Sequence, residues 1–267
     1  MKRIDYCGKT AIVTGASSGI GREIARILIT KHGCTVYGVA RGEDRLNSLL
    51  SELGNSFIPY PMDVSQEQNW EKLRCELEKT DTRPDILINC AGILPEFKSF
   101  SDTGTEELER VMKVNFFSAV YACHHIMPIM NDGGAVGNVS SASALCPFGG
   151  VSSYTASKSA LNSFSQSLSC ERGRISVSSV MPGFVRTDIM KNQELSEKEE
   201  NAVRLFSAKA EKTAGRILSR LRKRKRRIVL GLDGHFMSVM YRLFPSLTPR
   251  LITRVLRASG MNLFKKI

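Results

Sequence analysis

The sequence predicts an α/β fold: a doubly wound parallel sheet of about seven strands, with helices on both faces and a helical extension at the C-terminus. Three observations predict it. Short apolar runs alternate with longer amphipathic segments, a glycine-rich turn joins the first run to the first amphipathic segment, and no Pro/Ser-rich linker divides the chain. A chain of 267 residues is long enough for one such domain with a well-buried core.

Seven runs have the length and composition of strands, and helical periodicity follows most of them. The expected strands span residues 9–14, 34–40, 56–60, 84–89, 134–140, 174–180 and 227–230. The expected helices span residues 22–32, 43–53, 66–79, 103–130, 152–172 and 202–221. Because parallel strands need crossover connections, this alternation favours a Rossmann-like sheet covered on both faces.

The turn after the first strand has the composition of a diphosphate-binding loop. Its glycines permit a tight turn and a close approach to the backbone amides, at the positive end of the following helix dipole. Between a strand and a helix in the first βαβ unit, this pattern indicates a dinucleotide site. The residues expected to hold the diphosphate are Gly15, Ser17, Ser18, Gly19, Ile20 and Gly21.

The ends of the next strands predict the rest of the cofactor site. Arg41 follows the second strand, where a guanidinium can pair with a ribose 2′-phosphate, so the sequence favours NADP(H). Asp63 and Val64 follow the third strand and are expected beside the adenine. The small residues after the fourth strand leave space for the cofactor, and the Pro-Gly turn after the sixth leads the chain over the strand ends. They are Asn89, Ala91 and Gly92, and Pro182, Gly183, Val185 and Thr187.

Tyr154 and Lys158 are the expected centre of the chemistry. They stand four residues apart in the expected helix 152–172, so their side chains share one face. A phenol has a pKa near 10, so a tyrosine that exchanges protons near neutrality needs a cation beside it. Ser141 closes the expected strand 134–140 and can approach the same substrate oxygen. Asn115 lies inside the expected helix 103–130, where it either satisfies a core polar group or interrupts the backbone ladder and holds water.

Taken together, these residues resemble the short-chain dehydrogenase/reductase family over about residues 8–232. The matching positions are Thr14-Gly15-x3-Gly19-x-Gly21, Asn89-x-Ala91-Gly92, Asn115, Ser141, Tyr154-x3-Lys158 and Pro182-Gly183. Cys90 departs from the family pattern, which usually has a second asparagine there; we expect it to alter packing and not activity.

The resemblance implies a role for each catalytic residue. Tyr154 donates the proton in ketone reduction or accepts it in alcohol oxidation, and Ser141 holds the substrate oxygen. Lys158 lowers the pKa of Tyr154 and, with Tyr154, contacts the nicotinamide ribose. Asn115 anchors a water that relays protons to Lys158. No metal is required, and a homodimer or homotetramer is expected.

Charge and cysteine content indicate where the basic residues lie and which cellular compartment suits the protein. The net charge is +12, but residues 209–267 alone carry +14 and the remainder −2, so the basicity belongs to the tail. Seven scattered cysteines without a C-x-x-C pair fit a reducing cytoplasm. Residues 1–8 leave no room for a signal peptide, and no apolar run is long enough to span a membrane. His124 and His125, with no carboxylate or cysteine at ligand spacing, are expected to be plain helix residues.

We expect a catalytic domain over residues 1–234, with a substrate lid near 187–208, and a basic amphipathic extension over 235–267. In the extension, apolar residues at helical spacing alternate with arginines, which predicts two helices broken by Pro245 and Pro249. These helices either pack over the substrate cleft or a subunit interface, or lie on an anionic membrane surface as a peripheral anchor.

The substrate is expected to be a hydrophobic ketone or alcohol, such as a steroid, bile acid or fatty-chain compound, because the residues expected around it are mostly apolar. They are Leu94, Leu145, Phe148, Phe184, Ile189 and Met190. One alternative is a 3-oxoacyl thioester on an acidic carrier protein, which the basic tail would attract. A second is a non-catalytic nucleotide-binding or nucleic-acid-binding protein. The basic run 220–227 lacks interleaved aromatic residues and does not favour nucleic acid.

Overall fold

The structure is a computed structural model, and it describes residues 3–171, 173–190, 193, 196–197, 199–201 and 207–267. Much of the expected lid over 187–208 lies outside the described residues. The same holds for residue 172, where helix 152–172 was expected to end, and for 202–206, where helix 202–221 was expected to begin.

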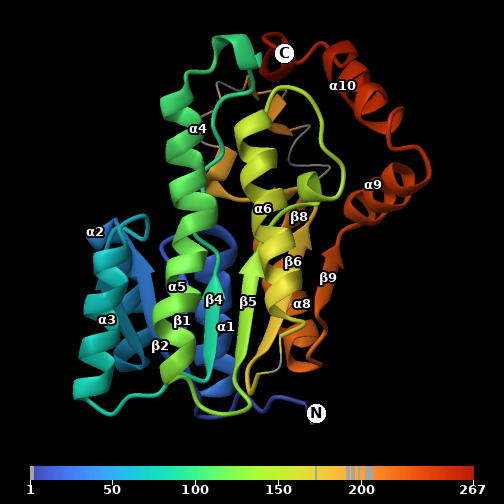
Figure 1. Ribbon diagram of the computed structural model, residues 1–267. Coiled ribbons are helices and arrows are strands. Elements are labelled where there is room, and N and C mark those ends of the chain that lie inside the picture. The colour runs from blue at the N-terminus through green and yellow to red at the C-terminus, as the bar shows by residue number, and fades with distance from the viewer. Residues whose placement is uncertain (1–2, 172, 191–192, 194–195, 198, 202–206) are drawn as a thin grey trace.

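The sheet has seven parallel strands, as the alternation of strands and helices predicted (Figure 1). In spatial order they are β3 (Phe57–Pro61), β2 (Thr35–Ala40), β1 (Thr10–Thr14), β4 (Ile86–Asn89), β5 (Ala135–Val139), β6 (Ser176–Pro182) and β9 (Arg227–Leu230). The order reverses between β1 and β4, and ligands of doubly wound sheets bind at such a switch point. A separate two-stranded ladder pairs β7 (Val185–Arg186) with β8 (Ala208–Lys209). Ala208 and Lys209 were expected to be helical, and α8 begins only after them.

Helices cover both faces of the sheet, and each face has its own apolar core (Figure 1). On one face lie α1 (Gly19–His32), α2 (Glu43–Leu53) and α8 (Ala210–Arg222). On the other lie α3 (Glu67–Lys79), α5 (Ser118–Ile126) and α6 (Ser152–Leu168). Helix α6 ends four residues earlier than expected, because the chain turns at Ser169 and Cys170. The short 3-10 turns are η1 (Gly54–Ser56), η2 (Phe100–Asp102), η4 (Met127–Ile129), η5 (Ala142–Ala144), η6 (Asp188–Met190) and η7 (Asn262–Phe264).

The expected continuous helix 103–130 is interrupted. Helix α4 (Thr105–Met112) leads into a π-helical turn, η3 (Lys113–Phe117), before α5 continues. Asn115 lies at the centre of this turn, and its carboxamide bonds outside the helix, to the backbone of Ile93 and the hydroxyl of Ser157. The π turn therefore forms where the asparagine is fastened to its surroundings, and π turns are frequent at functional sites.

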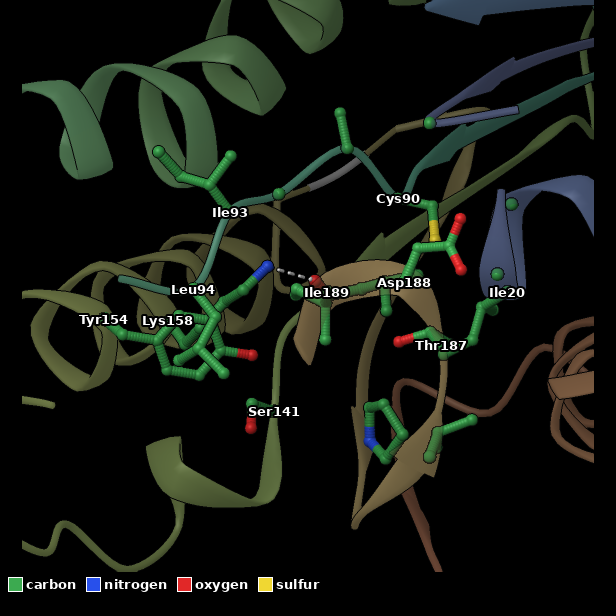
Figure 2. A pocket seen from close by; sticks show the side chains of 18 of the residues that line it. Ile20, Cys90, Ile93, Leu94, Ser141, Tyr154, Lys158, Thr187, Asp188 and Ile189 are labelled. Carbon is green, nitrogen blue, oxygen red and sulfur yellow. Dashed lines mark hydrogen bonds between the residues drawn. The ribbon is translucent and has the colours of Figure 1, made fainter. Parts of the chain in front are cut away.

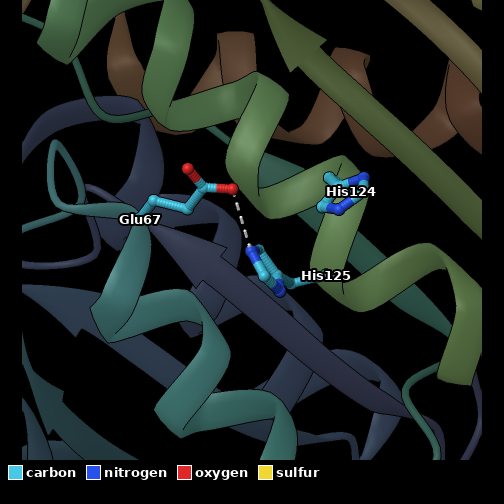
Figure 3. Close-up of side chains that lie close together, drawn as sticks. All are labelled: Glu67, His124 and His125. Carbon is cyan, nitrogen blue, oxygen red and sulfur yellow. Dashed lines mark hydrogen bonds and ion pairs between the residues drawn. The ribbon is translucent and has the colours of Figure 1, made fainter.

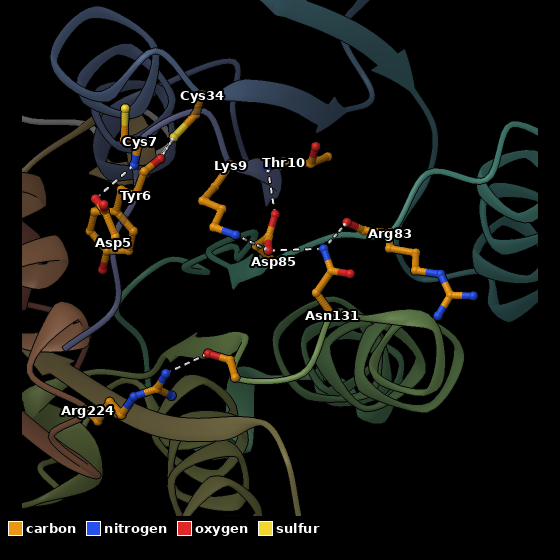
Figure 4. Close-up of polar contacts among 11 residues, drawn as sticks. Asp5, Tyr6, Cys7, Lys9, Thr10, Cys34, Arg83, Asp85, Asn131 and Arg224 are labelled. Carbon is orange, nitrogen blue, oxygen red and sulfur yellow. Dashed lines mark hydrogen bonds and ion pairs between the residues drawn. The ribbon is translucent and has the colours of Figure 1, made fainter. Parts of the chain in front are cut away.

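A polar network closes the amino-terminal edge of the sheet (Figure 4). The Asp85 carboxylate accepts from the backbone N–H of Thr10 (3.1 Å) and from Nδ2 of Asn131 (3.0 Å), and lies 3.0 Å from Nζ of Lys9. Arg224, from the basic run 220–227, donates to the carbonyl of Gly133 (2.6 Å) beside it. These side chains satisfy backbone groups where β1, β4 and β5 begin, so part of the basic run has a structural role.

The tail forms two helices, α9 (Leu232–Leu243) and α10 (Thr248–Ala258), followed by η7, and arches over the carboxyl edge of the sheet (Figure 1). Pro245 lies in the expected break. Pro249 does not break a helix: it occupies the first turn of α10, where the missing N–H needs no partner. No helix within the described residues is long and apolar enough to cross a lipid bilayer.

Candidate active site

A cavity of about 590 Å³ lies at the carboxyl ends of the parallel strands. One part is walled by the glycine-rich loop and the ends of β2 and β4, and the other by apolar side chains. The switch point of the sheet and the cavity therefore coincide, as expected for a dinucleotide fold.

The glycine-rich loop lines the cavity with all six residues expected to hold the diphosphate. Gly15 and Gly19 have φ angles of +67° and +54°, which favour glycine. At Gly21 an added Cβ would overlap the carbonyl of Gly15, so the loop can pack against the start of α1 only with glycine there. A loop of this shape at a helix N-terminus fits a diphosphate.

Arg41, Asp63 and Val64, which were expected beside the adenosine, line the cavity where β2 and β3 end. Arg45 also lines it, and was not predicted. It lies in the first turn of α2, which begins two residues after Arg41, and its guanidinium is 3.9 Å from the carboxylate of Asp188, which also lines the cavity. Sequence spacing could not place it, because Arg41 precedes the helix and the i, i+4 relation holds only within a helix.

The end of β4 meets the expectation only in part. Ala91 and Gly92 line the cavity, and an added Cβ at Gly92 would lie 3.2 Å from Nζ of Lys158. Asn89, expected to contact the cofactor, does not line the cavity: it is buried, and its Nδ2 donates to Oδ1 of Asn138 (2.8 Å). Nδ2 of Asn89 also lies 3.7 Å from Sγ of Cys123 on α5, so the side chain points toward the helical layer; its Oδ1 has no hydrogen-bond partner among the described residues. Cys90 lines the cavity, and burial raises the pKa of its thiol to about 11.

The four residues expected from the loop after β6, Pro182, Gly183, Val185 and Thr187, all line the cavity. Thr187 closes against the glycine-rich loop, because an added Cβ at Gly19 would meet its side chain at 2.9 Å. The carboxylate of Asp233 accepts from the backbone N–H of Phe184 (2.6 Å), which holds this loop to the start of α9.

Ser141, Tyr154 and Lys158 line one wall of the cavity (Figure 2). The side chains of Tyr154 and Ser141 point into the same space, and Nζ of Lys158 lies 5.9 Å from the centre of the Tyr154 ring. Lys158 is only 3% exposed and donates to the carbonyl of Val139 (3.0 Å). These three side chains therefore lie where the family resemblance placed them.

The pKa values of this group are governed by burial. Burial lowers the pKa of Lys158 to about 8, because the charged ammonium loses its hydration. Burial also raises the pKa of Tyr154, and the nearby hydroxyl of Ser141 opposes that rise without reversing it. The net direction for Tyr154 is opposite to the expected lowering by Lys158. An expectation based on spacing could not weigh the desolvation of the phenol by the surrounding protein.

Asn115 does not line the cavity and acts as a brace behind it. It is 1% exposed; its Oδ1 accepts from the N–H of Ile93 (2.7 Å), and its Nδ2 donates to the carbonyl of Ile93 (2.9 Å) and to Oγ of Ser157 (3.0 Å). These bonds tie the chain after β4 to α6. Since both amide N–H groups are used, the expected water would need another atom of this residue, and the relay stays a prediction.

The substrate half of the cavity is apolar. Leu94, Phe148, Phe184 and Ile189 line it as expected. Leu145 is buried outside the cavity. The side chain of Met190 is not among the described ones. The residues that the sequence did not predict include Phe97, Val151, Met237, Met261, Leu263 and Phe264. Four of these come from the tail, which packs over the cavity as one of the expected alternatives had it, although the sequence did not show which tail residues would reach the cavity.

One group of described residues, outside the lining of the cavity, brings together side chains of types that can bind a metal (Figure 3). Glu67 at the start of α3 lies 3.3 Å from Nε2 of His125, and His124 places a ring nitrogen within 4.8 Å of both. Sequence spacing could not show this carboxylate, because it comes from a different helix; that the two histidines are plain helix residues stays a prediction. None of the three residues lines the cavity, so they take no part in the site above.

The family model for short chain dehydrogenases matches residues 9–198. The chain belongs to this family. Members of the short-chain dehydrogenase family are oxidoreductases that bind a nicotinamide cofactor, act on small ketones or alcohols, and are generally oligomeric. The cavity described above is consequently the region in which this chain would hold its cofactor and substrate.

Individual relatives differ in how much of the chain they match. An (S)-benzoin-forming benzil reductase of Saccharomyces cerevisiae is 34% identical over 196 residues, covering 69% of this chain and 74% of that protein. A fatty acyl-CoA reductase of Acinetobacter baylyi is 31% identical over 270 residues, covering 96% of this chain and 85% of that protein. A short-chain dehydrogenase/reductase from Burkholderia phymatum, solved with NAD, superimposes with a TM-score of 0.81 at 20% identity, over 91% of this chain and 96% of its own. The last comparison supports the fold alone.

Proposed function

We propose that this chain is an NADP(H)-dependent oxidoreductase that interconverts a ketone and a secondary alcohol on a hydrophobic substrate. The observation that carries the proposal is the cavity itself. The hydroxyls of Ser141 and Tyr154 face an apolar half-cavity, and the glycine-rich loop walls the other half. Such a cavity suits a reaction at a carbonyl held between a cofactor and a proton donor.

In this proposal the chain's own residues handle the substrate oxygen. In ketone reduction the hydroxyl of Ser141 donates a hydrogen bond to the carbonyl oxygen, and Tyr154 Oη gives that oxygen its proton. The raised pKa of Tyr154 keeps the phenol protonated before the reaction. The ammonium of Lys158 stabilises the phenolate that remains. The bound nicotinamide would supply or accept the hydride.

Arg41 supports the preference for NADP(H), because it lines the cavity where β2 ends, the place where an adenosine ribose would lie, and Arg45 of α2 also lines the cavity. We expect wild-type protein to show a higher kcat/KM with NADPH than with NADH. Arg41→Ala should lower the NADPH value at least tenfold and leave the NADH value within about twofold, since a guanidinium–phosphate pair is lost. Arg83→Ala, a 66% exposed arginine outside the cavity, is the matched control. A wild-type preference for NADH would overturn the role of Arg41.

The apolar lining supports a steroid, bile acid or fatty-chain substrate. The fatty acyl-CoA reductase supports the fatty-chain class, because its match extends over 96% of this chain and so includes the tail. A panel of hydrophobic ketones, with a short water-soluble ketone for comparison, should be followed by NADPH absorbance. Turnover that rises with the apolar character of the ketone is expected; equal turnover across the panel would remove the substrate class from the proposal.

A 3-oxoacyl thioester on an acidic carrier protein is the second candidate, because the charge of +14 over residues 209–267 would attract such a carrier. The two candidates separate in one assay. A carrier-bound 3-oxoacyl substrate should be reduced no faster than the same acyl group on a small thiol if the tail does not recognise the carrier. A rate advantage that disappears in high salt would favour the carrier.

We propose that the enzyme works in the reducing cytoplasm as a homodimer or homotetramer, peripheral to an anionic membrane. All seven cysteines are free, which agrees with a reducing compartment.

Sedimentation equilibrium of the full chain tests the oligomeric state. A protein that stays monomeric at micromolar concentration would remove the homodimer or homotetramer from the proposal.

A further inference from the structure

The exposed apolar side chains of this protein are concentrated on the tail. Among the described residues eleven large hydrophobic side chains are exposed, and eight of them lie from Leu232 to Val255. Four of them, Leu232, Phe236, Val239 and Leu243, follow one another at intervals of four, three and four residues and so share one side of α9. Such a concentration marks an interaction site and not ordinary surface.

This side of the tail points away from the catalytic domain. The opposite side of α9 is anchored, because Met237 packs against Ala142 and Cys146, next to the catalytic serine. In α10 Leu251 and Val255 are 50% and 60% exposed, and Phe244 and Leu247 are exposed in the connecting turn. The helices project beyond the edge strand β9 (Figure 1). Among the described residues nothing covers their outer side.

Cations border the apolar side chains. Arg250, Arg254 and Arg257 lie four and three residues apart on α10 and so share one side of it. Arg242 is an exposed arginine in the last turn of α9. None of the four has an ion-pair partner among the residues described. From residue 232 onward the sequence has six lysines or arginines and, as its one acid, Asp233, which is bound to the backbone N–H of Phe184.

We propose that this outer side of α9 and α10, with its eight exposed apolar residues and four arginines, binds the surface of an anionic lipid bilayer. We call it the tail face. Apolar side chains flanked by cations are what an interfacial helix presents to acyl chains and anionic headgroups. Self-association through the same face is disfavoured, because a two-fold contact would set its arginines against each other with no acid between them.

The tail face is continuous with the substrate cavity. The segment that carries it also supplies Met237, Met261, Leu263 and Phe264 to the cavity lining. Resting on the proposed function, the tail face would bring this wall next to lipid and allow an apolar ketone to enter from the bilayer. The partner and the substrate would then be recognised by adjacent parts of one segment.

Flotation with vesicles of phosphatidylcholine and phosphatidylglycerol tests the proposal. The full chain should bind at low salt, and should bind phosphatidylcholine alone or at high salt at least tenfold more weakly. Phe236→Ser/Leu243→Ser and Arg250→Gln/Arg254→Gln/Arg257→Gln should each weaken binding at least tenfold. The matched controls are Phe100→Ser, 55% exposed elsewhere, and Arg216→Gln/Arg220→Gln/Arg226→Gln, three exposed arginines outside the tail face.

The outcomes are separable. The proposal would be overturned if the wild type did not bind vesicles, if the tail variants bound as well as the wild type, or if the arginine control lost as much binding as the tail variants. It would also be overturned if the tail variants changed only the sedimentation coefficient. Turnover of a short water-soluble ketone should be equal in wild type and tail variants. Vesicle binding without turnover of any ketone would overturn the proposed function and leave the tail face intact.

Discussion

Each edge of the sheet has a lysine close to a strand end, and the two lysines differ in exposure and in their partners. At the amino edge Lys9 is 42% exposed and lies 3.0 Å from the carboxylate of Asp85, which also satisfies the N–H of Thr10. At the carboxyl edge Lys158 is 3% exposed and donates a hydrogen bond to the backbone carbonyl of Val139, and no carboxylate pairs with it among the described residues.

The difference separates stability from function. A partly exposed ion pair that also completes backbone hydrogen bonds keeps the strands in place at little desolvation cost. A buried cation without a counter-ion destabilises the fold, and burial lowers its pKa to about 8. Perturbed pKa values of this kind gather at functional sites. The amino edge is therefore built to hold the sheet together, and the carboxyl edge is built for a reaction at some expense of stability.

The largest effect should come from the phenol beside Lys158. Tyr154→Phe keeps the ring and removes the transferable proton, so kcat for ketone reduction should fall by about 10³-fold, within the range of general acid catalysis. NADPH affinity, measured by fluorescence titration, should stay within about threefold. Tyr121→Phe, on α5 and outside the cavity, should leave kcat unchanged. Turnover of the Tyr154 variant within tenfold of wild type would contradict the mechanism.

At the amino edge the effect should be on stability. Asp85→Ala leaves the N–H of Thr10 and the amide of Asn131 without their acceptor, so the free energy of unfolding should fall by about 2 to 3 kcal/mol. Activity of the folded fraction should not change. Asp132→Ala removes the surface pair with Arg174, with side chains 62% and 74% exposed, and should cost under about 1 kcal/mol. Urea unfolding measures both, and equal losses would show that the network has no special role.

Lys158→Met should stabilise the protein at pH 7 while abolishing turnover. The pKa of Lys158 is lower in the folded chain, about 8, than its usual 10.5, so below pH 8 the fold carries a charge that it disfavours. The wild type should therefore gain stability as the pH rises from 8 to 10.5. At pH 7 the variant should gain about 1 to 2 kcal/mol, after the loss of the bond to Val139. Lys9→Met should give no such gain. A gain that persists at pH 10.5 would have another origin.

The smallest expected effect is on the pH profile. As the pH rises through about 8, Lys158 loses its proton and the phenolate of Tyr154 loses its stabilising charge. The kcat/KM for ketone reduction, which reports ionisations of the free enzyme, should therefore fall by about tenfold between pH 7 and 9. Initial rates from pH 6 to 10 measure it, and a profile that stays flat to pH 9.5 would exclude this assignment.

The elements that the sequence predicted well depend on local patterns. Strand runs, the loop with Gly15, Gly19 and Gly21, and the Tyr154–Lys158 spacing can be read from a few adjacent residues, because period and backbone conformation are local properties. Arg41 belongs with them, since its place depends only on where β2 ends.

The features that the sequence did not predict depend on contacts between distant segments. Asn89 faces Asn138, Glu67 meets His125, and Leu263 reaches the cavity only because the tail folds back over it. The direction of the pKa of Tyr154 also depends on how much protein encloses the ring. Sequence spacing carries no measure of enclosure or of long-range pairing.

The π turn at Lys113–Phe117 changes how this helix can diverge between related chains. A π turn holds one residue more than an α-helical path would, and one residue corresponds to about 100° of rotation around the axis. Losing a single residue here would keep α5 in the core through Ala122 and Ile126, but would turn α4 and the Asn115 brace away from Ile93. The extra residue therefore fixes the rotation of α4 relative to α5. Substitutions in either helix can accumulate separately as long as this residue keeps that rotation.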